Sequence, residues 1–157
     1  MIFVSVGTAR DFSRLVKEVD KLAEGLKDEV IIQKGQTKYD PKNCKYFDFI
    51  PRDKFLEFIK KADIIITHGG VGTIINSLNC EKPSIVVPRR KKYNEHKNDH
   101  QMDIAKELES EGRIITCYEV DELKNKIKIA RGFKTPKISQ ERNKIKKTLR
   151  DFIETRS

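Results

Sequence analysis

Asp63-Ile64-Ile65-Ile66-Thr67-His68-Gly69-Gly70-Val71-Gly72-Thr73 joins a continuous apolar run to a glycine-rich segment near the middle of the chain. An uninterrupted β-branched run of this kind is typical of a strand that is buried on both faces, as in a parallel sheet. A helical segment follows and extends to about Asn79. A strand that passes directly into a helix is the first part of a βαβ unit, so we expect parallel strands.

The same alternation of strand-like and helical segments continues on both sides of this run. Apolar residues at helical spacing separate the strand-like segments and place a helix at each crossover. Right-handed crossovers distribute those helices over both faces of the sheet. The predicted strands cover residues 2–6, 30–32, 46–50, 63–67, 84–87 and 113–117, and the predicted helices cover 12–26, 53–61, 71–79, 100–110, 121–130 and 139–153. We therefore predict an α/β fold with a Rossmann-like parallel sheet and helices on both faces.

Charge is distributed unevenly along the 157 residues. The segment from Lys124 to Ser157 has 12 basic and 3 acidic residues, whereas the rest of the chain has 21 of each, so the net charge of +9 arises in the C-terminal region. We therefore divide the chain into a Rossmann-like domain at 1–132 and a basic helical tail at 133–157. Such a tail favours an anionic partner (a membrane surface, a nucleic acid or an acidic protein), or it is a solvated helix face.

The remaining composition argues against several classes of protein. Cysteine occurs at Cys44, Cys80 and Cys117 without a C-x-x-C pair, which indicates reduced thiols rather than a disulfide framework or a zinc site. No run approaches the roughly 20 apolar residues of a membrane-spanning helix. No basic segment precedes the opening strand as it does in a secretory signal. We expect a cytoplasmic protein.

Three unusual loops, at 7–10, 68–73 and 89–101, follow predicted strands, at the sheet edge where open α/β folds bind ligands. In the second loop, glycines let a ligand approach the backbone closely. The amides of the first helical turn, together with the helix dipole, form an anion site suited to a diphosphate. Thr73 adds a hydroxyl and His68 a ring N–H. The spacing matches neither of the common phosphate-loop motifs, and a tight turn whose glycines serve packing alone is the alternative.

The third loop, from Arg89 to Gln101, is long and highly charged. Carboxylate, amide and imidazole groups there supply both donors and acceptors, which sugar hydroxyls need. Two alternatives remain. His96 and His100 are four residues apart, a spacing that places two metal ligands on one helical face, but no third ligand is fixed by the sequence. The segment is otherwise an ordinary solvated loop.

These motifs together resemble the C-terminal domain of family-28 glycosyltransferases. The resemblance is carried by His68-Gly69-Gly70-Val71-Gly72-Thr73, Lys82-Pro83, Val86-Val87-Pro88-Arg89, Glu95-His96 and Asn98-Asp99-His100-Gln101, and it covers roughly residues 1–130. The chain is most similar to small stand-alone catalytic subunits of lipid-linked glycan, capsule and exopolysaccharide synthesis. The resemblance implies the donor-binding half of a GT-B enzyme, without the half that binds the acceptor.

The resemblance also implies roles for individual residues. The diphosphate-binding residues of the family correspond to Gly7, Thr8, His68, Gly69, Gly70, Val71, Gly72 and Thr73. The segment that contacts the donor sugar corresponds to Arg89, Glu95, His96, Asp99, His100 and Gln101. Asn76 stands where many relatives have a glutamate that binds the ribose hydroxyls, and an amide can also bond a hydroxyl. The backbone near Ile50 is expected to face the uracil edge.

The family implies an inverting hexosyltransferase that moves GlcNAc, galactose or glucuronate from a UDP-sugar to a lipid-linked acceptor. A helix N-terminus stabilises the departing diphosphate, so no metal or other cofactor is expected. No catalytic base is identified in this chain, and the family implies that a membrane-anchored partner subunit supplies it. We therefore expect a cytoplasmic protein that is recruited to the cytoplasmic face of a membrane.

Two other functions stay open: an epimerase-like enzyme and a nucleic-acid-binding module that would use the basic tail. An epimerase-like enzyme of the same architecture would need a second domain in the same chain. A nucleic-acid-binding module would use the basic tail, but only Phe133 and Phe152 offer stacking surfaces there, so we expect no nucleic-acid partner. We expect instead that the stripe of Ile145, Leu149 and Phe152 docks on the partner protein, with the tail lysines toward anionic lipid.

Overall fold

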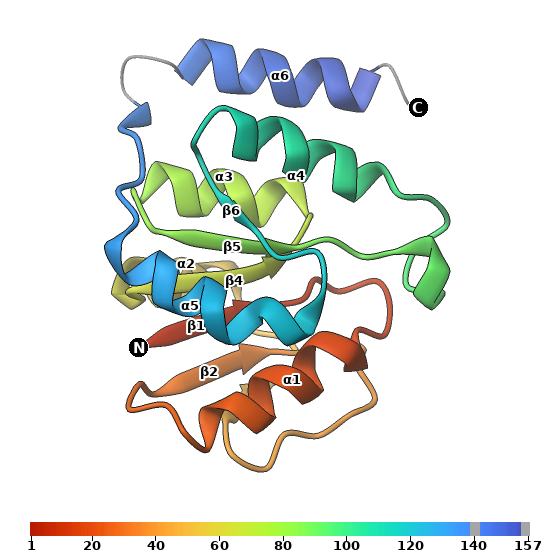
Figure 1. Cartoon of the computed structure of the whole chain (residues 1–157), viewed down its shortest axis with the longest axis vertical. Coiled ribbons are helices and arrows are strands. Elements are labelled where there is room, and N and C mark those ends of the chain that lie inside the picture. The colour runs from red at the N-terminus through yellow and green to blue at the C-terminus, as the bar shows by residue number, and fades with distance from the viewer. Residues whose placement is uncertain (139–141, 155–157) are drawn as a thin grey trace.

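A computed structural model describes residues 1–138 and 142–154 (Figure 1). The strands are β1 (Ile2–Ser5), β2 (Val30–Gln33), β3 (Lys45–Phe47), β4 (Ile64–His68), β5 (Ser84–Val87) and β6 (Ile115–Thr116). The α-helices are α1 (Ser13–Ala23), α2 (Arg52–Lys61), α3 (Val71–Asn79), α4 (His100–Ser110), α5 (Leu123–Gly132) and α6 (Arg142–Glu154), and two short 3-10 helices cover Lys91–Tyr93 (η1) and Val120–Glu122 (η2).

The strands form one parallel sheet in the order β3-β2-β1-β4-β5-β6. The predicted Rossmann-like fold is therefore confirmed. The predicted third and sixth strands are shorter than expected because both lie at the sheet edges, where each has a neighbour on one side only. The strand order reverses between β1 and β4, which pair from Ile2 beside Ile64 to Ser5 beside Thr67. Ligands of doubly wound folds bind beyond the carboxyl ends of the strands at such a reversal.

Helices cover both faces of the sheet. On one face, α1 and α5 pack on the strands through residues such as Leu15, Val19 and Ile127. On the other, α2 packs on Phe3 and Ile65, while α3 and α4 cover the β5 side of the sheet. Both layers hold the central strands rigid, and the loops that leave the carboxyl ends of those strands are positioned by that rigid frame.

The C-terminal helix α6 lies alongside α4 (Figure 1), and its apolar stripe packs inside this chain. Ile145 and Leu149 are 4% and 3% exposed, in one cluster with Ile74 of α3 and Leu108 of α4. The expectation that these two side chains dock on a partner is therefore wrong, because their apolar surface is already covered. The predicted cap at Ser139 lies outside the described residues, as do the side chains of Phe152 and Ile153.

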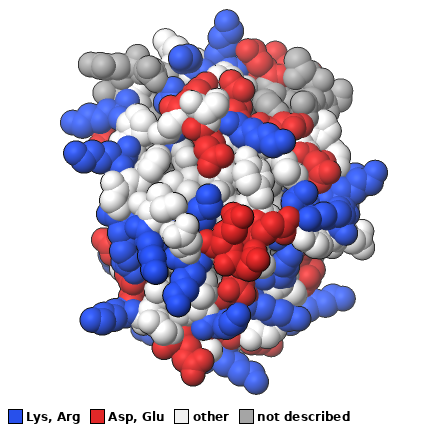
Figure 2. All heavy atoms as spheres, viewed as in Figure 1, with Lys and Arg blue, Asp and Glu red and all other residues white. Residues whose placement is uncertain are grey.

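The basic groups of the tail remain at the surface. Lys144, Lys147 and Arg150 of α6 are exposed, as are Lys124 and Lys128 of α5. Figure 2 shows Lys and Arg side chains interspersed with Asp and Glu over the face that carries α1 and α5, so this face presents charge of both signs. No helix in the described part of the chain is long and apolar enough to span a bilayer.

Candidate functional site

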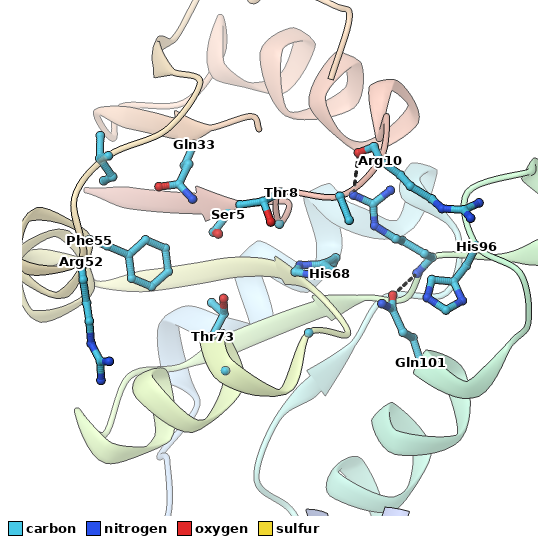
Figure 3. Close-up of a pocket in the computed structure, with 16 residues that line it drawn as sticks. Ser5, Thr8, Arg10, Gln33, Arg52, Phe55, His68, Thr73, His96 and Gln101 are labelled. Atoms are coloured by element: carbon cyan, nitrogen blue, oxygen red, sulfur yellow. Dashed lines mark hydrogen bonds between the residues drawn. The ribbon is translucent and has the colours of Figure 1, made fainter. Parts of the chain in front are cut away.

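A cavity of about 530 Å³ opens where β1, β2 and β4 end, at the strand-order reversal (Figure 3). Two of the three loops singled out in the sequence meet there, together with the two ends of the third. Its lining consists of Ser5, Gly7, Thr8, Ala9, Arg10, Gln33, Ile50, Arg52, Phe55, His68, Gly70, Gly72, Thr73, Arg89, His96 and Gln101. Ten of these positions are among the predicted site residues, so most of the predicted residues converge on one cavity.

The imidazole of His68 lies between two glycines in this cavity. Gly7 has a left-handed φ of +77°, and a Cβ there would lie 2.6 Å from Nε2 of His68. A Cβ on Gly70 would lie even closer to the same atom. Only glycine therefore fits at either position while the ring keeps this place, and the loops after β1 and β4 come together around one side chain.

The same environment sets the charge of His68. Burial lowers the pKa of His68 to about 4, and the neighbouring charge of Arg89 acts in the same direction. The ring is therefore neutral near pH 7, with one nitrogen that carries a proton and one that does not. A neutral imidazole can donate one hydrogen bond to an anion, and it adds no charge of its own to the site.

The positive potential of the site comes from helix α3. Gly70 is the N-cap residue of this helix and has no side chain that could bond the first-turn amides. The first amides of any helix have no partner within the helix, and the helix dipole places partial positive charge at the same end. Gly72 and Thr73 of this turn line the cavity. The arrangement suits a phosphate or diphosphate group.

Arg89 lines the cavity, but its guanidinium is bonded to the protein itself. It is 3% exposed and donates to the carbonyl oxygens of Val6 at 2.7 Å, Asp11 at 2.8 Å and Arg10 at 3.0 Å. It also stacks on the ring of Phe12 at 4.6 Å. The predicted sugar contact through this side chain is therefore corrected: these nitrogens hold the loop after β1 in place.

Gln101 and His96 are the two other predicted sugar-binding residues that line the cavity. Gln101 lies at the start of α4, and its Oε1 accepts a hydrogen bond of 3.0 Å from the backbone N–H of Arg89 (Figure 3). With the oxygen occupied in this way, the amide nitrogen remains as the donor of this side chain. Nδ1 of His96 lies 3.1 Å from Oδ1 of Asn98.

The other three predicted sugar-binding residues lie outside the described lining of this cavity. Glu95 is 6% exposed because its carboxylate is bound to Arg14, at 2.7 and 3.0 Å, and to the backbone N–H of Arg90 at 3.0 Å. Asp99 accepts a 2.8 Å hydrogen bond from the N–H of Lys91. His100 begins α4. The placement differs from the prediction because the first two carboxylates shape their own loop.

Three predicted positions in and after the β4–α3 turn also lie outside that lining. Gly69 packs against Gln101, since a Cβ there would lie 2.6 Å from the Cβ of that residue, and Val71, the first residue of α3, is partly buried against the core cluster of α3 and α4. Asn76 lies one turn further along α3, in a second cavity of about 250 Å³ between α3 and α6. Ile50 lines the main cavity, and its expected place beside the uracil stays a prediction.

Four lining residues were not singled out in the sequence: Ser5, Gln33, Arg52 and Phe55. Ala9 and Arg10 belong to the predicted loop at 7–10 but were given no role of their own. Gln33 ends β2 and Arg52 begins α2. Both belong to the edge where all parallel strands have their carboxyl ends, so the predicted topology carried a signal for them. A pattern of glycine and histidine alone does not single them out.

A metal site formed by His96 and His100 depended on both residues lying on one helix. Helix α4 begins at His100, so His96 belongs to the preceding loop. Among residues 1–138 and 142–154, no three His, Cys, Asp or Glu side chains are grouped so that they could hold a metal ion.

Comparison with protein families gives a match to the glycosyltransferase family 28 C-terminal domain over residues 1–155. The chain belongs to this family. The match includes α6, which agrees with the packing of that helix on α3 and α4.

Curated relatives match over part of their length. The mouse protein named UDP-N-acetylglucosamine transferase subunit ALG13 is 32% identical over 126 residues, which cover 73% of this chain and 10% of the relative. A Prochlorococcus marinus protein named UDP-N-acetylglucosamine–N-acetylmuramyl-(pentapeptide) pyrophosphoryl-undecaprenol N-acetylglucosamine transferase is 33% identical over 73 residues, 46% of this chain and 19% of the relative. This chain thus spans about a tenth of the mouse protein.

Solved structures share the fold. An NMR structure of ALG13 superposes with a TM-score of 0.60 and 21% identity, covering 88% of both chains. The glycosyltransferase of kitacinnamycin gives a TM-score of 0.63 and 19% identity, covering 96% of this chain and 39% of the other. MurG of Acinetobacter baumannii gives 0.59 and 18%, covering 94% and 49%. In the last two proteins this fold makes up less than half of the chain.

Proposed function

We propose that this chain is the donor-binding part of a glycosyltransferase that moves a hexose from a UDP-sugar to a lipid-linked acceptor. The observation that carries the proposal is the cavity at the strand-order reversal, where the uncapped N-terminus of α3 faces the loop after β1. Family membership supports the reaction type.

The donor nucleotide is proposed from the names of the relatives. The mouse and Prochlorococcus relatives both have UDP-N-acetylglucosamine in their names. UDP-GlcNAc is therefore the first donor to test, with UDP-galactose and UDP-glucuronate as alternatives. The uridine would extend from the diphosphate toward Ile50, and the sugar would lie near His96 and Gln101, which lie across the cavity from Arg52 and Phe55 (Figure 3).

The chemistry follows from where charge develops during transfer. As the bond between sugar and phosphate breaks, positive charge grows on the anomeric carbon and negative charge on the departing diphosphate. The amides and dipole at the start of α3 are placed before the reaction begins and stabilise that negative charge. The reaction would proceed with inversion and without a metal ion. We assign no base to this chain, so deprotonation of the acceptor hydroxyl is assigned to the acceptor-binding partner.

Calorimetry tests the donor assignment directly. The purified chain is titrated with UDP, UDP-GlcNAc, UDP-galactose, UDP-glucose and UDP-glucuronate, with ADP and GDP as controls, in the presence and absence of EDTA. We expect saturable binding of UDP and of one UDP-sugar that survives EDTA, and weaker binding of the purine nucleotides. Failure of every uridine ligand to bind, with and without the acceptor-binding partner, would contradict the proposal.

The partner and the membrane are proposed on separate grounds. A membrane-anchored subunit would supply the acceptor half, and the exposed lysines and arginines of α5 and α6 would add attraction to an anionic cytoplasmic surface. Sedimentation with vesicles that contain anionic lipid, against neutral vesicles, measures the second effect. We expect salt-sensitive binding to the anionic vesicles only, and equal binding to both would contradict the membrane contact.

A further inference from the structure

Arg89 is a fully buried cation in the wall of the cavity, and the proposed chemistry does not use it. A charged group that is removed from water must be paired or fully hydrogen-bonded to be tolerated. Here the guanidinium is held by carbonyl oxygens and an aromatic ring, since it bonds Val6, Arg10 and Asp11 and stacks on Phe12. Burial lowers the pKa of Arg89 to about 10, so it keeps its charge at neutral pH.

The bonds of Arg89 connect three parts of the site. Arg89 follows β5 in the chain, and its guanidinium reaches the two ends of the loop after β1. Its backbone N–H donates to Oε1 of Gln101 at the start of α4. Thr8 and Ala9, between the anchored ends of that loop, are exposed, so packing contributes little to their placement. The guanidinium therefore fixes a segment that has few other restraints.

We propose that Arg89 is a positioning residue whose guanidinium holds the loop from Gly7 to Arg10 in its binding arrangement before the donor arrives. A planar guanidinium can bond several carbonyls at once, whereas the ammonium of a lysine is a compact point charge. The three bonds are made from two separate nitrogens, Nη1 toward Asp11 and Nη2 toward Val6 and Arg10, whereas a lysine has a single nitrogen at one point. The role needs the shape of arginine as well as its charge.

The test uses the full chain with Arg89→Met and Arg89→Lys, and Arg113→Met as the matched control. Arg113 is also buried, at 2% exposed, but it pairs with Glu111 just before β6, outside the described lining of the cavity. Amide hydrogen exchange of residues 7–11 is measured without ligand, at equal fractions of folded protein. We expect faster exchange in that loop for Arg89→Met, an intermediate rate for Arg89→Lys, and no change for Arg113→Met.

UDP affinity is measured in the same proteins, and this arm rests on the proposed function. We expect a loss of about 10-fold or more for Arg89→Met, because charge-assisted hydrogen bonds are removed, a smaller loss for Arg89→Lys, and none for Arg113→Met. Unchanged exchange at 7–11 in Arg89→Lys and Arg89→Met would overturn the inference. If Arg89→Met does not fold, Arg89→Lys alone decides the result. A wild-type chain that fails to bind UDP would refute the proposed function, while the exchange data would still test Arg89.

Discussion

The β4–α3 turn and the β5–α4 connection border the same cavity and are built on different principles. The first is made from backbone and glycine, and its one large side chain, His68, fills the space that two Cβ atoms would need. The second is held by carboxylate side chains, because Glu95 accepts from the Arg14 guanidinium and Asp99 accepts from the backbone N–H of Lys91. A turn of the first kind leaves backbone amides open to a ligand. In a connection of the second kind, the polar side chains form hydrogen bonds within the protein that stabilise the loop.

This difference decides what could be predicted from sequence. The turn at 68–73 is local, so strand, glycines and helix start follow one another in the chain, and the anion site could be placed from that order. The partners of Glu95 and Arg89 in the second segment are distant in sequence. Arg14 is 81 residues from Glu95, and the carbonyls that occupy Arg89 are 78 to 83 residues away. Residue type alone suggested sugar contacts for groups that are already bonded.

The same reasoning explains the successes and failures in the fold. Alternating strand-like and helical segments predicted the parallel sheet and its two helical layers, because each element carries its own periodicity. The surface against which the apolar stripe of α6 packs could not be predicted in this way. An apolar stripe shows that a helix is buried against something, and Ile145 and Leu149 turned out to pack on α3 and α4 of the same chain.

The largest expected effect comes from a methyl group in the turn. Gly70→Ala would place its Cβ against Nε2 of His68, so the ring or the turn must move. We expect UDP affinity to fall by about 100-fold, the scale of a misplaced site. Calorimetry is compared with Gly132→Ala, whose Cβ meets no atom within 4 Å. Equal affinity in the two variants would show that the turn is not a rigid cradle.

The second segment is tested by removing its ion pair. Glu95→Ala leaves the Arg14 guanidinium, 17% exposed, without its carboxylate partner. We expect the free energy of unfolding to fall by about 2 kcal/mol, less than for a fully buried pair because Arg14 retains some solvent contact. Denaturant titration measures the change. Glu57→Ala, which breaks the exposed pair with Lys54, is the control and should have a much smaller effect.

A smaller effect is expected from pH. The pKa of His68 lies near 4 in the folded protein and near 6.5 when unfolded, so the unfolded state binds more protons between these values. Stability from this group is complete above pH 6.5 and is lost as pH falls toward 4, by at most about 1.4 kcal/mol per pH unit. Between pH 6.5 and pH 5, the melting temperature of His68→Asn should fall less with decreasing pH than that of the wild-type chain. An equal dependence of the melting temperature on pH in the two proteins would contradict this depressed pKa.

The smallest effect is expected at Asp99. Its carboxylate bonds the Lys91 N–H at the exposed side of the connection. We expect Asp99→Ala to reduce stability by about 0.5 kcal/mol, as for one exposed hydrogen bond, and to leave UDP-sugar affinity almost unchanged. Calorimetry with UDP-GlcNAc is compared with Gln101→Ala, a change inside the cavity. If Asp99→Ala loses as much UDP-GlcNAc affinity as Gln101→Ala, the Asp99 carboxylate contacts the sugar after all.

The packing of His68 between Gly7 and Gly70 also restricts the order in which these positions can change during evolution or design. While the imidazole is present, a side chain at either glycine collides with it, so neither glycine can be replaced before position 68 changes. Replacing the ring by a smaller group would open Gly70 to alanine, whereas Gly7 would keep its backbone constraint. A library built on this chain should therefore vary position 68 together with position 70, since single changes would hide the combinations that are tolerated.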